Sequence, residues 1–124
     1  MNQSLRLLTL IAVFCFASSA IAQPVNDDCV NAIPAVIGAN AFDTTGATDD
    51  SADLTGFCDF GAFGDEMLHA DIWYTFTPAA DGNFTFDLSG TTGFGDSRIA
   101  IYAGVNCPNM ASTVVACDDD GAGT

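Results

Sequence analysis

The sequence predicts an all-β fold, a β-sandwich or jelly-roll-like arrangement, and three observations lead to this prediction. Several short runs between residues 72 and 116 alternate apolar with polar side chains, which is the period of a half-buried strand. Clusters of Gly, Pro, Asn and Asp separate these runs, as turns do in an antiparallel fold. After residue 22, no stretch repeats its apolar residues at the spacing of a helix.

The first part of the predicted domain, residues 23–65, favours loops. It consists mostly of Asp, Ala, Thr, Gly and Asn and holds few large apolar residues. We expect one short strand over residues 39–45. Residues 46–65 are expected to form a long acidic loop that Cys58 holds in place.

A β-hairpin is predicted next. Apolar and polar residues alternate over residues 72–77 and again over residues 83–89. The Asp81-Gly82 pair between these arms favours a tight turn. Trp73 lies on the face opposite its two neighbours, and we expect it to pack in the core rather than to form a sugar-binding platform.

Two more strands are expected, over residues 98–103 and 113–116. Five strands would leave an apolar edge open to other chains, so we expect the sandwich to be incomplete at its C-terminal end. The chain is then expected to be a fragment, or further strands are expected to come from elsewhere.

The first 22 residues have the three parts of a secretory signal peptide. Arg6 precedes an apolar run over residues 7–16, and Ala20-Ile21-Ala22 supplies the small residues of a cleavage site. The apolar run is well short of the roughly 20 residues that a membrane-spanning helix needs. We therefore expect cleavage before residue 23, no membrane insertion afterwards, and one secreted, extracellular or cell-surface domain over residues 23–124.

The cysteines predict two disulfides. Cys15 belongs to the leader, and the four that remain are Cys29, Cys58, Cys107 and Cys117. An even number in an exported chain is typical of a disulfide framework, for which three pairings are possible. Pairing of near neighbours, the first cysteine with the second and the third with the fourth, is favoured because it needs the least rearrangement of the chain. A four-thiolate zinc site is disfavoured, since structural zinc cysteines come in closely spaced pairs.

The charge of the chain narrows its partners. The formal net charge is −14, and loss of the leader removes one of two basic residues but none of the 16 acidic ones. Such a surface repels phosphate, which argues against nucleic acid and anionic lipid as partners. The expected partner is therefore an extracellular protein or polysaccharide of unknown identity. The acidic surface itself is expected to attract divalent cations or simply to be hydrated.

Calcium is the predicted cofactor, because it prefers oxygen ligands and weak sites of about 10⁻⁴ to 10⁻³ M suffice outside the cell. Two acidic turns supply such ligands, one just before the first cysteine of the mature chain and one near the C-terminus. The candidate ligands are Asn26, Asp27, Asp28, Asp118, Asp119 and Asp120. The alternative is that both groups are solvated turns without an ion.

No catalytic apparatus is apparent, and we expect the chain not to be an enzyme. His69 stands alone; it follows Glu66 at a spacing used by diiron bundles, which need two such copies on helices. Neither a zinc-protease pair of histidines nor a Gly-x-Ser-x-Gly elbow is present in the sequence. Arg98 is expected to make a structural ion pair, with Asp71 or Asp87 as the candidate partners.

Five stretches of the sequence carry a resemblance when their order and spacing are taken together. They are Asn26-Asp27-Asp28-Cys29 with Ala32-Ile33-Pro34, Asp71-Ile72-Trp73-Tyr74-Thr75-Phe76-Thr77-Pro78, Asp81-Gly82-Asn83-Phe84-Thr85-Phe86, Asp96-Ser97-Arg98-Ile99-Ala100-Ile101-Tyr102, and Val115-Ala116-Cys117-Asp118-Asp119-Asp120. Together they resemble the bacterial pre-peptidase C-terminal (PPC-like) domain family. The resemblance implies a β-sandwich module of the kind appended to secreted hydrolases or repeated in surface proteins. Some members bind calcium or polymeric substrates such as collagen. Members have further strands after the Asp-rich turn, so the resemblance also implies a truncated module over residues 23–124.

The leading functional hypothesis is a non-enzymatic secreted or cell-surface module for adhesion or interaction, stabilised by calcium. The alternative is an accessory, substrate-binding module of a secreted hydrolase whose catalytic domain is not in this chain. A third hypothesis is a purely structural segment without a binding function.

Overall fold

The computed structural model describes residues 21–60, 66–88, 97–104, 107 and 113–119. The elements in chain order are the 3₁₀ turn η1 (Cys29–Asn31) and the strands β1 (Ile33–Pro34), β2 (Tyr74–Thr75), β3 (Arg98–Tyr102) and β4 (Val114–Asp119). These described parts contain strands and no α-helix, which confirms the all-β class. None of their helices is long and apolar enough to cross a membrane. The predicted signal peptide lies outside the described residues, apart from its last two positions.

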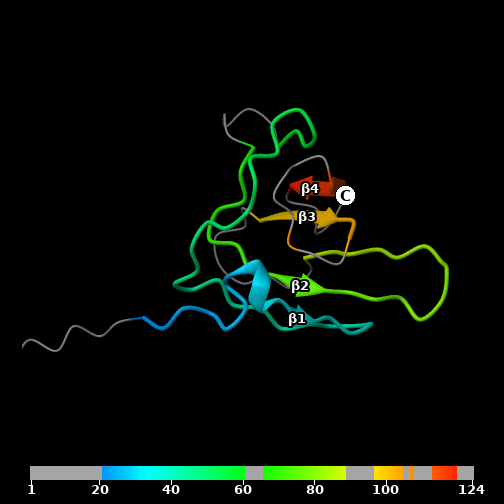
Figure 1. Ribbon diagram of the computed structural model, residues 1–124, viewed down its shortest axis with the longest axis horizontal. Coiled ribbons are helices and arrows are strands. Elements are labelled where there is room, and N and C mark those ends of the chain that lie inside the picture. Colours follow the sequence, from blue (N-terminus) through cyan, green and yellow to red (C-terminus); the bar gives the residue numbers. More distant parts are fainter. Residues whose placement is uncertain (1–20, 61–65, 89–96, 105–106, 108–112, 120–124) are drawn as a thin grey trace, which may run out of the picture.

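The strands form two two-stranded sheets that lie one above the other in Figure 1. In the lower sheet, β1 and β2 run parallel, and the N–H of Ala35 donates to the carbonyl of Thr75 at 2.8 Å. The predicted strand over residues 39–45 is wrong, because none of these residues is in a strand. Asn40 accounts for the difference, since its side chain accepts from the N–H of Val36 and donates to the carbonyl of Val36, both at 2.9 Å. These local bonds favour a turn over a strand.

The upper sheet pairs β3 with β4 in antiparallel register. Ala100 lies opposite Cys117 and Ile101 opposite Ala116, but Tyr102 pairs with Val114. The residue between Val114 and Ala116 is therefore extra, and the sheet has a β-bulge there. β4 extends beyond the predicted strand over residues 113–116 and includes two of the predicted calcium ligands.

The predicted hairpin is wrong in its pairing. β2 pairs with β1, and residues 76–88 contain no strand. This segment runs out from the body of the molecule and returns (Figure 1). The ring of Phe76 nevertheless contacts Phe84 and Phe86 edge to face, with centroids 5.0 and 5.4 Å away. The two arms thus meet through aromatic side chains.

The core of the molecule lies in a region that the sequence analysis expected to be an acidic loop. The core residues expose less than a tenth of their surface to solvent and fall between positions 54 and 68. They are Leu54, Cys58, Phe60 and Leu68, and Ala100, Tyr102, Val114 and Cys117 of the upper sheet pack against them. Leu54 is completely buried. These apolar residues are irregularly spaced, so a search for periodicity does not detect them.

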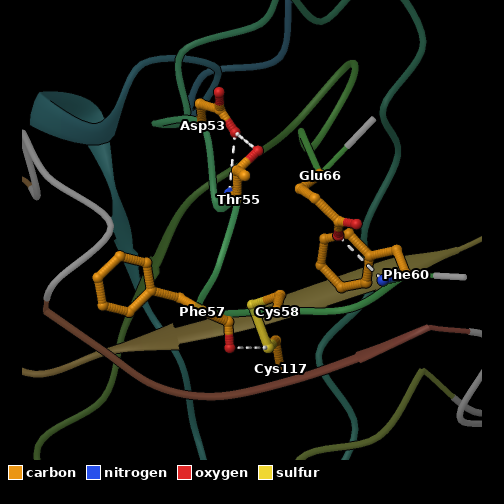
Figure 2. Close-up of a disulfide and its surroundings, with 7 residues drawn as sticks. All are labelled: Asp53, Thr55, Phe57, Cys58, Phe60, Glu66 and Cys117. Carbon is orange, nitrogen blue, oxygen red and sulfur yellow. Dashed lines mark hydrogen bonds between the residues drawn. A yellow bond between two sulfur atoms is a disulfide. The ribbon is translucent and has the colours of Figure 1, made fainter. Parts of the chain in front are cut away.

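A backbone hydrogen bond and one carboxylate hold the parts of this loop together. The N–H of Leu54 donates to the carbonyl of Glu66 at 3.0 Å. The Glu66 carboxylate accepts from the N–H of Phe60, also at 3.0 Å. Figure 2 shows this contact beside the disulfide between Cys58 and Cys117, with the ring of Phe57 on the other side.

The four cysteines after residue 22 all form disulfides, but the predicted pairing of near neighbours is wrong. Cys29 pairs with Cys107, 78 positions away, and Cys58 pairs with Cys117, 59 positions away. The reason is the register of the upper sheet, which turns Cys117 toward the core beside Cys58. The Cα–Cα distances of 5.6 and 6.1 Å are usual for disulfides.

Candidate functional site

Two of the predicted calcium ligands are buried and bonded to the protein itself. Asp27 is 5% exposed and accepts from the N–H of Thr48 at 2.6 Å and from its hydroxyl at 2.8 Å. Asn26 exchanges two bonds with Trp73, donating from Nδ2 to the carbonyl at 2.9 Å and accepting from the N–H at 2.8 Å. Both residues therefore tie the start of the domain to segments distant in sequence.

The third predicted ligand of this turn, Asp28, is exposed. Its Oδ2 lies 3.4 Å from Nδ2 of Asn31, within the 3₁₀ turn η1. Of the three predicted ligands Asn26, Asp27 and Asp28, Asp28 is the one whose side chain is exposed to solvent.

A series of aspartates joins three segments of the chain side by side. The N–H of Cys29 donates to Asp50 at 2.8 Å, and the N–H of Asp50 donates to Asp71 at 2.8 Å. Asp49 likewise accepts from the N–H of Ala70 at 2.8 Å. Each pair joins residues 21 positions apart, so the connected segments run in the same direction. Hydrogen bonds to ionised acceptors are stronger than neutral ones, which makes this network a stabilising feature.

The other oxygen of Asp49 lies 2.9 Å from Nδ1 of His69, and about half of each side chain is exposed. Ala70, the next residue, has a φ of +50°, a left-handed conformation that residues other than glycine seldom adopt. The bond from its N–H to Asp49 holds it there. The Asp49–His69 pair therefore links two loops at the surface of the protein.

The second group of predicted calcium ligands lies on a strand instead of on one turn. Asp118 and Asp119 are adjacent in β4 and therefore face opposite sides of the sheet. Asp119 is 3.6 Å from Nε of Arg98, and Asp118 is exposed. Asp120 lies outside the described residues. Among the residues that the structure describes, no three His, Cys, Asp or Glu side chains lie together as metal ligands would.

Arg98 has a structural environment. Its partner Asp119 stands opposite it across the sheet, a pairing that the sequence analysis did not name. Nη1 donates to the carbonyl of Met67 at 2.9 Å, and the guanidinium lies 4.9 Å from the centre of the Phe60 ring. Arg98 thereby fixes one end of the upper sheet to the core.

Among the described residues, the buried polar atoms without a hydrogen-bond partner include Oδ2 of Asp71, Nε1 of Trp73 and the hydroxyl of Tyr102. Burial raises the pKa of Asp71 above its usual 3.8, and the nearby charges of Asp50 and Asp49 act in the same direction. Burial, and then the charge of Asp71, raises the pKa of Tyr102. The rings of Trp73 and Tyr102 lie 5.5 Å apart. As predicted, Trp73 is buried, at 9% exposure.

The outer face of the upper sheet forms an open groove of about 230 Å³. Its lining is mostly apolar and comprises Phe84, Thr85, Phe86, Ile99, Ile101, Ala116, Cys117 and Asp118. Phe84 and Phe86, the apolar residues of the alternating run over residues 83–89, are each 41% exposed. We call this feature the outer groove.

A second hollow, of about 320 Å³, lies around residues 22–26. Residues 22, 24–26, 33, 41–43, 45, 72 and 74 line it. It includes Phe42, which is 42% exposed. We call it the N-terminal hollow.

Sequence reasoning missed the partners of Asp27 and the outer groove. The polar segment Thr48-Asp49-Asp50 repeats the acidic character of residues 26–28, and this repetition is the one local sign of the network. The groove has no local sign, because it depends on how residues 84–86 lie against the upper sheet.

No known family, curated protein or solved structure matches the chain. The resemblance to the PPC-like family therefore stays a prediction from the motifs quoted above.

Proposed function

We propose that the mature chain is a secreted or cell-surface, non-enzymatic β-sandwich module of the PPC-like kind, which binds an extracellular protein or polysaccharide. One observation carries this proposal: an apolar groove with two exposed aromatic rings lies on a frame held by disulfides. Exposed apolar surface of this kind marks interaction sites. Disulfides are typical of proteins that work in an oxidising extracellular environment.

The frame supports binding because it is fixed before a partner arrives. Cys117 is part of the groove lining and is bonded to Cys58 in the core. Phe76 stacks edge to face on both exposed rings of the groove. A surface held in its binding conformation loses less entropy on association than a mobile one.

The use of the carboxylates supports a binding role over catalysis. Asp27 and Asp71 are buried, and each accepts a hydrogen bond from a backbone N–H group. Acceptors engaged in this way hold loops together. A general acid or base would need access to a substrate.

Calcium stabilisation is the second part of the proposal, and the exposed carboxylates of Asp28 and Asp118 support it as starting points for an extracellular site. If calcium binds the folded chain alone, a concentration of about ten times Kd adds about 1.4 kcal/mol of stability and raises Tm by several degrees. Calorimetry in EDTA, in magnesium and in millimolar calcium measures this. A Tm unmoved by calcium removes the metal from the proposal and leaves the binding module.

Binding itself is tested with the oxidised, processed chain on an interferometry sensor. The ligands are a panel of extracellular matrix proteins, including collagen, and of insoluble polysaccharides. We expect saturable binding to at least one member and its loss after reduction and alkylation of the disulfides. Turnover of a substrate by the chain alone, or no binding to any ligand in the panel or to the peptides described below, contradicts the proposal.

A further inference from the structure

We infer that the outer groove is a docking site for an extended protein segment in which apolar side chains alternate with basic ones. This inference rests on the proposed function and names the class of partner. Its argument has three steps, which concern the two faces of the upper sheet, the spacing of the groove residues, and the charge of the molecule.

The upper sheet is apolar on both faces. Ala100, Tyr102 and Cys117 pack on the core from one face. Ile99 and Ile101 line the groove on the other face. An antiparallel sheet that covers a core on one face usually exposes polar residues on the other. The second apolar face of this sheet is thus suited to contact with another polypeptide.

The groove residues are spaced like the side chains of an extended chain. Ile99 and Ile101 are alternate residues of β3 on the groove side, and Phe84 and Phe86 line the groove beside them. Alternate side chains of a strand are about 6.5 to 7 Å apart. An extended segment laid along the groove therefore places its own alternate side chains at the same spacing.

The polar groups of the groove argue against an anionic ligand. Thr85 supplies a hydroxyl and Asp118 a carboxylate, and the other side chains of the groove are those of Phe84, Phe86, Ile99, Ile101 and Ala116. An anionic ligand needs a cation, and the residues that line the groove offer none. An apolar segment makes no such demand.

The charge of the molecule sets the charge of the partner. Asp118 faces the groove beside the isoleucines, since it is paired with Ile99 across the sheet. The chain as a whole carries 16 acidic and two basic residues. Lysine or arginine beside the apolar side chains of the partner is attracted to this surface, whereas a second copy of the chain is repelled.

The experiment uses a short labelled peptide in which Lys alternates with Val and Phe, and a matched peptide with Glu in place of Lys. Fluorescence anisotropy with the oxidised chain measures both, at low and at high salt. We expect the Lys peptide to bind, more weakly at high salt, and the Glu peptide not to bind. Phe84→Ser combined with Phe86→Ser should weaken binding at least tenfold, because aromatic anchors dominate such contacts.

The matched control is Phe42→Ser. It removes the same kind of ring, equally exposed, from the N-terminal hollow, and we expect it to leave the affinity within about twofold, as substitutions outside an interface do. Asp118→Lys leaves the apolar lining intact and tests the charge step separately. It should weaken binding of the Lys peptide and reduce the difference in affinity between the two peptides, because the molecule stays acidic as a whole.

The outcomes separate this inference from the proposed function. Binding that survives loss of both groove rings but not loss of Phe42, or a panel ligand that binds while neither peptide does, overturns the inference and leaves the module a binding protein. A concentration-dependent dimer in sedimentation that the paired Phe84 and Phe86 substitutions abolish overturns it in favour of a second copy. Circular dichroism shows that each variant is folded before its affinity is counted.

Discussion

In two neighbouring regions of the molecule, the burial of the apolar side chains is the opposite of what the sequence pattern suggests. Residues 48–71 are acidic and show no apolar period, yet they bury Leu54 and Phe60 almost completely. Residues 72–88 alternate regularly, yet Phe84 and Phe86 keep two fifths of their surface exposed. Alternation predicts that a segment is extended; it does not predict that the segment is covered.

The difference between the regions lies in their ties to the rest of the chain. The acidic region is joined to β4 by a disulfide, to Asp27 through Thr48, and to η1 through Asp50. Long-range covalent and charge-assisted bonds bring its few apolar residues together. The aromatic region follows β2 out of the body of the molecule (Figure 1) and is packed through contacts among its own rings.

The largest effect on stability should come from removing the disulfide between Cys58 and Cys117. Replacing both Cys58 and Cys117 by Ala should cost about 4 kcal/mol of unfolding free energy through chain entropy, and more through lost packing of Cys58. The matched control replaces Cys29 and Cys107, which close a loop of similar size but lie nearer the surface. Urea unfolding measures both. A cost no greater for the first pair than for the second would show that the core does not depend on this tie.

Side-chain truncation compares the two regions directly. Leu54→Ala removes a fully buried side chain and should cost about 3 kcal/mol, within the usual range for such cavities. Phe84→Ala removes a larger but half-exposed side chain and should cost about 1 kcal/mol or less, because its remaining contacts are with neighbouring rings. Equal costs in urea unfolding would mean that the aromatic region is as well packed as the core.

The sequence predicts the β class and the burial of Trp73, because both depend on local patterns. It does not predict the disulfide pairing, which follows from the register that places Cys117 opposite Ala100. The same limit applies to the site. Asn26 and Asp27 stand out in the sequence, but their partners lie 47 and 21 positions away. Contacts at such distances in sequence leave no period that a reading of one chain detects.

The smallest expected effect on stability comes from the ionisation of Asp71, whose carboxyl lies at the boundary between the two regions. Burial raises the pKa of Asp71 above 3.8, so the folded chain holds this proton more tightly than the unfolded chain. Ionisation of Asp71 therefore reduces stability as pH rises from about 3.8 through its folded pKa, and the loss is complete above that pKa. Asp71→Asn cannot ionise, and its stability relative to the wild type should increase with pH over this window.

Asp43 provides a control of opposite sign for this pH dependence. Hydrogen bonds from the hydroxyl and N–H of Thr45 lower the pKa of Asp43, so its contribution is present above 3.8 and is lost as pH falls through its folded pKa. Asp43→Asn should therefore be less stable than the wild type at neutral pH, and the difference should vanish in acid. Urea unfolding of the three proteins across this pH range gives both slopes. If the Asp71→Asn difference instead falls as pH rises, a positive charge that the described residues do not supply lowers the pKa of Asp71, as a bound calcium ion would.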